Sequence, residues 1–110
     1  MQINPEGILI ESGTETGETG KTTMSVQTIR KIGKLVIFTL AFSTNSALAI
    51  ADVVFTLPWT PDSRYDFLGV VAQGSPCTFV ANSAKQVIFN TGTINNGVNV
   101  FVSGSYITTD

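Results

Sequence analysis

The sequence of 110 residues contains no histidine, a single cysteine and few charged residues. Without histidine, the chain lacks the usual general base, the Ser-His-Asp arrangement and the commonest transition-metal ligand. The single Cys77 excludes an intramolecular disulfide and a cysteine metal cluster, and we expect it to be a small buried side chain. We therefore predict that the protein is not an enzyme and that it needs no metal and no cofactor.

Charged residues make up 13% of the chain, against about 25% in typical soluble domains, whereas the hydrophobic fraction of 43% is ordinary. Uncharged Thr, Ser, Asn and Gly must then cover the surface, which is typical of β-rich proteins of the extracellular type. The net charge is −2, and six scattered basic residues cannot supply a row of phosphate contacts. We do not expect nucleic acid as a partner.

Residues 30–49, RKIGKLVIFTLAFSTNSALA, have the layout of a signal peptide, because two cations precede an apolar run and Ala47-Leu48-Ala49 follows. The apolar run covers only residues 35–42, which is too short for a membrane helix of about 20 residues. Its β-branched and aromatic residues favour a strand. We predict a β-strand, and the alternative is a secreted bacterial β-domain made from Met24 and cut after Ala49.

The chain divides by composition near residue 23. Residues 1–23 predict a short strand at 7–11, followed by a flexible, acidic Gly/Thr linker without apolar residues. The linker contains GETGKTT, but Glu15 stands where a phosphate loop requires its first glycine, so we interpret this stretch as a solvated loop. Residues 24–110 are predicted to form one β-sandwich domain.

Short apolar runs separated by turn residues follow residue 23, at the spacing of a sandwich. We predict an all-β, antiparallel β-sandwich of jelly-roll type, with about seven strands and almost no helix. Gly33 and the Asn95-Asn96-Gly97 sequence supply the positive φ angles that hairpin turns require. The expected strands are residues 24–31, 34–43, 51–57, 67–73, 77–82, 86–91 and 97–108.

Two of the expected strands are apolar on both faces. In 34–43, the side that carries Phe38 lies opposite Leu35 and Ile37, and in 97–108 Phe101 and Ile107 lie opposite a row of valines. Soluble monomers rarely expose a large second apolar face. We predict a homo-oligomer with an interface at Leu35, Ile37, Phe101 and Ile107. The alternative is that the strand at 7–11 or long loops of the same chain cover these residues.

Four features in succession carry a resemblance to a known family: RKIGKLV at 30–36, TLP at 56–58 with Pro61, NTGTI at 90–94 and VSGSYI at 102–107. Their order resembles the C-terminal β-sandwich domains of tail-fibre, baseplate and receptor-binding proteins of siphophages that infect Gram-positive bacteria. The resemblance covers residues 24–108. It implies a homotrimer on the virion, facing outward, that recognises a host cell-wall saccharide or holds another tail protein in place. A purely structural baseplate connector is the alternative role.

The stretch LPWTPDSRYDF, residues 57–67, gathers aromatic, cationic and acidic side chains on a loop with two prolines. Sugars stack on aromatic rings, and their hydroxyls bond to carboxylate and guanidinium groups. The stretch therefore predicts a saccharide-binding set, although the same residues could instead cap the core and form surface ion pairs. No apolar pocket is evident for the acid of a glycosidase, so we do not expect hydrolysis. The predicted set is Trp59, Asp62, Arg64, Tyr65 and Asp66.

Overall fold

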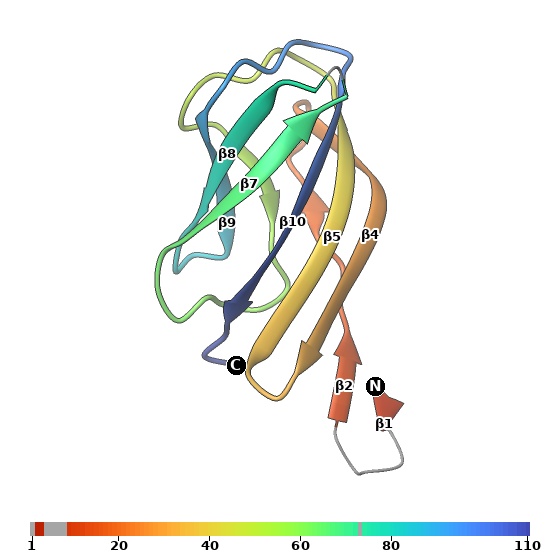
Figure 1. Cartoon of the computed structure of the whole chain (residues 1–110), viewed down its shortest axis with the longest axis vertical. Helices are drawn as coiled ribbons and strands as arrows, with labels where there is room; N and C mark the ends of the chain where they lie inside the picture. The colour runs from red at the N-terminus through yellow and green to blue at the C-terminus, as the bar shows by residue number, and fades with distance from the viewer. Residues whose placement is uncertain (1, 4–8, 73) are drawn as a thin grey trace.

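The computed structural model of the chain describes residues 2–3, 9–72 and 74–110 (Figure 1). None of these residues is helical, so the described part contains no helix that could cross a membrane. The strands are β1 (Gln2–Ile3), β2 (Leu9–Ser12), β3 (Thr16–Gly17), β4 (Thr22–Ile32), β5 (Leu35–Thr44), β6 (Val53–Thr56), β7 (Tyr65–Val71), β8 (Pro76–Ala81), β9 (Gln86–Thr91) and β10 (Asn99–Ile107). The predicted all-β, antiparallel class is confirmed. The seven strands expected between residues 24 and 108 correspond to β4 through β10. Strand β2 includes residues 9–11 of the short strand expected at 7–11, and the first two residues of that strand lie outside the described ranges.

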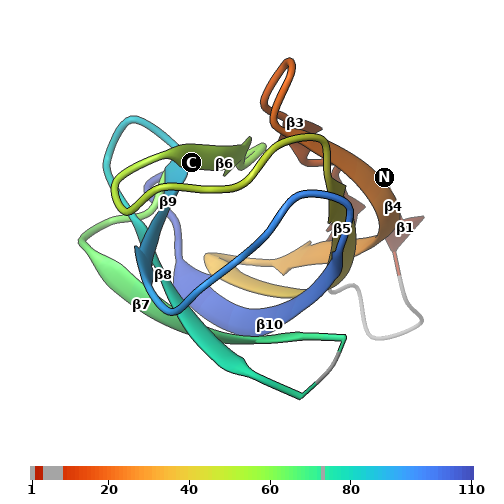
Figure 2. The same cartoon turned by 90° about the horizontal axis from the view of Figure 1, so that it is seen from above.

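The strands form one antiparallel sheet in the order β1-β2-β4-β5-β10-β7-β8-β9-β6-β3. Seen down the long axis, β4, β5, β10, β7, β8, β9 and β6 follow one another around a common centre (Figure 2). Strands β4 and β5 form a hairpin, and Gly33 takes a φ of +60° in its turn, as the sequence predicted. The last strand, β10, returns between β5 and β7, so the sheet contains pairings between segments far apart in sequence.

The two ends of the curled sheet come together at a seam between β4 and β6. Strand β3 pairs with β6 and also lies against the start of β4. The hydroxyl of Thr22 in β4 donates a hydrogen bond to the carbonyl oxygen of Val54 in β6. The sheet therefore surrounds its core instead of leaving one side open.

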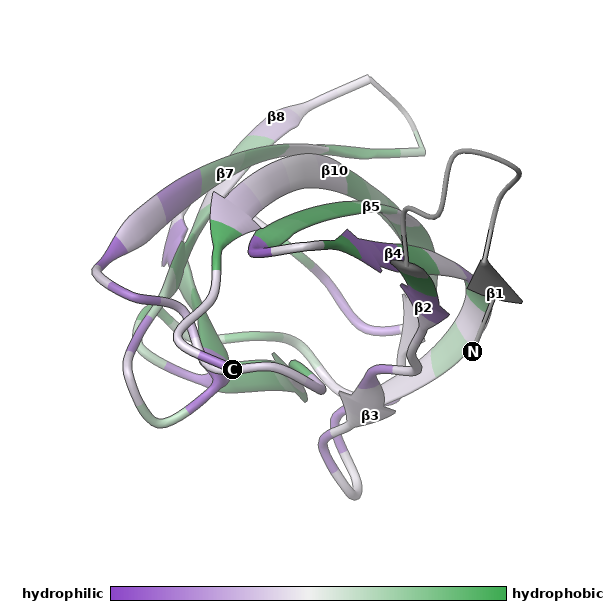
Figure 3. Cartoon of the chain, turned by 90° about the horizontal axis from the view of Figure 1, so that it is seen from below, coloured by the Kyte–Doolittle hydropathy of each residue, from purple (hydrophilic) through white to green (hydrophobic). Residues whose placement is uncertain are grey.

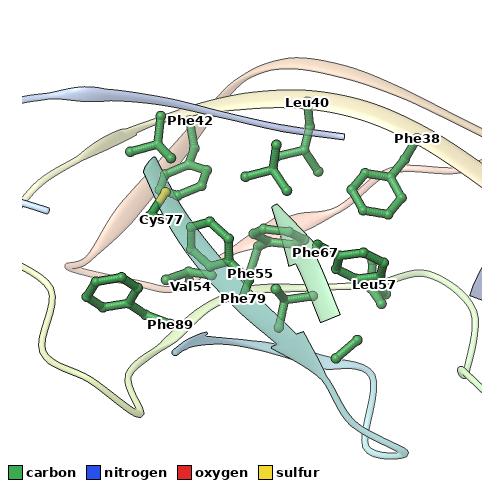
Figure 4. Packing of buried hydrophobic residues seen from close by; sticks show 14 of the residues in the cluster. Phe38, Leu40, Phe42, Val54, Phe55, Leu57, Phe67, Cys77, Phe79 and Phe89 are labelled. Atoms are coloured by element: carbon green, nitrogen blue, oxygen red, sulfur yellow. The ribbon is translucent and has the colours of Figure 1, made fainter. Parts of the chain in front are cut away.

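The core is aromatic. The chain has seven phenylalanines, and all except Phe101 are buried. In Figure 4, Phe38, Leu40 and Phe42 of β5 point toward Phe55 and Phe79, which come from the opposite wall. The rings of Phe38 and Phe67 meet edge to face, with 4.8 Å between their centroids. Full burial of such a side chain contributes about 1.5–3 kcal/mol, so this cluster is the main source of stability.

One glycine lets two of these rings approach the backbone. Gly104 of β10 lies opposite Phe38 in the strand register. A Cβ atom at this position would lie 2.7 Å from Cδ1 of Phe67, closer than real contacts allow. The inner face of β10 is therefore shaped around the aromatic cluster.

The predicted exposed linker within residues 12–23 requires a correction. Thr16 and Gly17 pair with β6, and the backbone N–H of Gly13 donates to the carbonyl oxygen of Ile29 at 3.2 Å. Glu15, which the composition placed in solvent, is buried. The composition misled because a short segment can be held by backbone hydrogen bonds to the sheet without apolar side chains of its own.

Candidate functional site

The wall formed by β4, β5, β10 and β7 turns an apolar surface outward. In its register, Ile107 of β10 is paired with Leu35 of β5, and Phe101 of β10 with Val70 of β7. Paired residues of antiparallel strands point to the same side of a sheet, so these side chains share one surface. We call this surface the outer face. Its large exposed apolar residues are Val26, Leu35, Ile37, Leu68, Val70, Phe101 and Ile107.

The structure leaves all four predicted interface residues, Leu35, Ile37, Phe101 and Ile107, exposed on the outer face. Strand β2 does not cover them, because it pairs with the free edge of β4. When the ribbon is coloured by hydropathy, β5 is apolar along most of its length (Figure 3). Both sides of β5 are therefore apolar, but the described part of the chain buries mainly one of them.

Sequence reasoning missed Leu68, Val70 and Val26. Leu68 is 68% exposed and lies opposite Ser103, and Val26 is paired with Ala41, which is paired with Phe101. The signal for β7 was available, because FLGVV at 67–71 is apolar at every position except glycine. The position of Val26 was harder to find, because the register of β4 shifts between Met24 and Val26.

The outer face contains a shallow hollow of about 250 Å³. Leu68, Val70 and Phe101 supply its apolar side chains, and the hydroxyl residues Thr39 and Ser103 lie between them. Formal charges lie at the two sides of this wall, where Arg30 is on β4 and Asp66 is on β7. A surface that is apolar at its centre and charged at its rim is typical of a protein interface.

The predicted saccharide loop is fastened to the C-terminal segment. The N–H of Asp62 donates to the carbonyl oxygen of Ile107 at 2.8 Å, and the N–H of Thr109 donates to the carbonyl oxygen of Thr60 at 3.0 Å. The Thr108 hydroxyl also donates to the Thr60 carbonyl, at 2.6 Å. These bonds fix the path of the loop, so its side chains have defined directions.

Trp59 is half-buried and packs against the core. Its carbonyl oxygen accepts a hydrogen bond from the Tyr106 hydroxyl at 2.9 Å, and the Lys31 ammonium group lies 5.8 Å from the centroid of its ring. Its ring also contacts Gly13, where an added Cβ atom would lie 2.9 Å from ring atom Cη2. These contacts match the core-capping interpretation of this residue.

The other four residues of the set form two local pairs. The Tyr65 hydroxyl donates to Asp62 Oδ1 at 2.7 Å and accepts from the N–H of Ile107. Arg64 Nε donates to Asp66 Oδ1 at 3.3 Å, and both side chains are about two-thirds exposed. Such an exposed ion pair contributes about 0–1 kcal/mol. Arg64 also lines a second shallow hollow, of about 240 Å³, but no other member of the set does.

The pKa values of Cys77 and Asp52 are also shifted. Cys77 is buried, and burial raises the pKa of its thiol, which disfavours the reactive thiolate. The pKa of Asp52 is lowered, first by the N–H of Ala49 and then by Lys21. Within 2–3, 9–72 and 74–110, no group of three acidic, Cys or His residues could hold a metal ion.

No family model matches this sequence, and no curated protein shows significant similarity to it. The geometry of the outer face is therefore the main basis for a functional conclusion.

Proposed function

We propose that this chain is a non-catalytic assembly module of a phage tail or baseplate, whose copies associate as a homotrimer through the outer face. The assembled module then holds another tail protein or recognises a host saccharide. The resemblance of residues 24–108 to siphophage tail domains supports the virion role, and the absence of histidine supports a non-catalytic one.

The observation that carries the proposal is the uncovered outer face. Its apolar residues come from four adjacent strands and include an exposed phenylalanine in a chain that buries its six others. Leaving this area in water is unfavourable by about 25 cal/mol for each Å² of apolar surface. Association of copies removes the same patch from water on every subunit.

The test is light scattering coupled to size exclusion over a concentration series. We expect a mass of three times the 11.7 kDa of one chain. The double variant Leu68→Ser/Phe101→Ser should give a monomer, because both side chains are exposed in one chain and their loss affects only the interface. Ile50→Ser is the matched control, since Ile50 is 57% exposed and lies outside the outer face. A wild-type protein that stays monomeric at every concentration contradicts the proposal.

The two roles of the module are separated by binding measurements on the wild-type assembly. The docking role is supported if the assembly captures a purified tail protein and if a variant with substitutions in its exposed loops still assembles but no longer captures that protein. Binding to cell-wall saccharide, reduced by Arg64→Ala and Asp66→Ala, supports the recognition role. We use these two substitutions because their side chains are exposed, whereas Trp59→Ala would also remove packing against the core.

A further inference from the structure

Glu15 is a buried carboxyl group at the seam of the sheet. It belongs to residues 13–17, which follow β2 and include β3. We call these five residues the strap. Glu15 is only 3% exposed, and neither of its carboxyl oxygens has a hydrogen-bond partner among the described residues. A buried ionised carboxylate without a partner is strongly unfavourable, so this environment favours the protonated form of the group.

The strap is held to both sides of the seam. On the β4 side, Gln27 Oε1 accepts from the N–H of Glu15 at 2.8 Å, and Gln27 Nε2 donates to the Glu15 carbonyl oxygen at 3.0 Å. On the β6 side, Thr16 and Gly17 pair with Thr56 and Phe55. The strap therefore connects β4 to β6, and its docking keeps the Glu15 side chain out of water.

The neighbouring charges do not favour ionisation of Glu15. Burial is the largest influence on the carboxyl group and raises its pKa, and the nearby backbone N–H of Glu15 opposes this only in part. Tyr106 of β10 has a raised pKa, caused first by burial and then by the charges of Glu15 and Asp110. Lys31 of β4 is bonded to Glu11 at 2.6 Å. Neither Tyr106 nor Lys31 is bonded to the carboxyl group of Glu15.

We propose that the strap is a pH-dependent latch: protonated Glu15 keeps it docked across the seam, and ionised Glu15 releases it. Release exposes the edges of β4 and β6, together with the ring of Trp59 that Gly13 contacts. This inference does not depend on the outer face or on the oligomeric state.

The sign of the effect follows from the two protonation equilibria. The docked form binds the proton more tightly than the released form, in which Glu15 ionises near its ordinary value of 4.5. Docking is therefore fully favourable below this pH and weakens as the pH rises through the pKa of the docked form. With one proton involved, the docking equilibrium changes by at most about tenfold per pH unit.

The chain carries its own reporter, because Trp59 is the only tryptophan and it contacts the strap. Over the pH range above 4.5, the ordinary value of a glutamate carboxyl, we expect wild-type emission to shift to longer wavelength as the ring becomes exposed. Glu15→Gln keeps the shape of the side chain but cannot ionise, so its emission should stay at the short-wavelength value over this range. Glu18→Gln removes a charge from the next turn of the chain and should behave as the wild type.

Hydrogen exchange on the wild-type protein gives a second measurement that needs no variant. The amides of Gly13 and Glu15, both hydrogen-bonded to β4, should lose protection by up to about tenfold per pH unit after correction for intrinsic exchange. The amides of β10 should not change. Protection of Gly13 and Glu15 that is independent of pH, or an identical emission profile for Glu15→Gln and the wild type, overturns the proposal.

Discussion

The two faces of β5 and β10 carry similar residues in opposite environments. Phe38 and Val102 are at most 2% exposed. On the same two strands, Phe101 and Ile37 are almost half exposed. The difference is not one of residue type, because both faces are rich in aromatic and branched side chains. The sheet buries one face by curling around a core, whereas the other face stays exposed in the described part of the chain.

Removal of a ring from the inner face should have the largest effect. We expect Phe38→Ala to reduce the free energy of unfolding by about 3–5 kcal/mol, because it removes a buried ring and leaves a cavity among Phe67 and Tyr106. Urea denaturation measures this loss. Phe101→Ala is the matched variant of the outer face, and its effect should depend on protein concentration, because in the proposed assembly this residue acts through association. Equal, concentration-independent losses would contradict the distinction between the faces.

Addition of one methyl group to the inner face should have an intermediate effect. Gly104→Ala places a Cβ atom against the Phe67 ring, and we expect a loss of about 1–3 kcal/mol from overpacking. The neighbouring Ser103→Ala lies on the outer face and should change stability by less than about 0.5 kcal/mol. Thermal unfolding of the two variants side by side checks this prediction. If Gly104→Ala left the stability unchanged, the aromatic cluster would be able to move and accommodate the added methyl group.

Loss of the exposed ion pair should have the smallest effect. Arg64→Ala removes the hydrogen bond to Asp66, and we expect a change of about 0–1 kcal/mol that disappears at high salt. Denaturation at low and high ionic strength provides the measurement. A larger, salt-independent loss would show that Arg64 contributes to packing, which its exposure does not suggest.

The sequence was informative about the strands and less so about the sites. The β-branched and aromatic runs located strands β4 through β10, because strand preference and turn chemistry act over a few residues. The saccharide set was chosen by residue type alone. The structure brings its members together only as Asp62 with Tyr65 and Arg64 with Asp66, while Trp59 turns toward the core, so saccharide binding stays a prediction.

The sequence by itself determined that this chain forms strands, where they turn and that β5 is apolar on both sides. Only the tertiary structure decided which side is buried, because a strand with apolar residues on both faces has no alternation that selects a register. It also decided that β10 lies between β5 and β7 and that Glu15 is buried in the seam. These features depend on contacts between residues far apart in the chain, which no local pattern specifies.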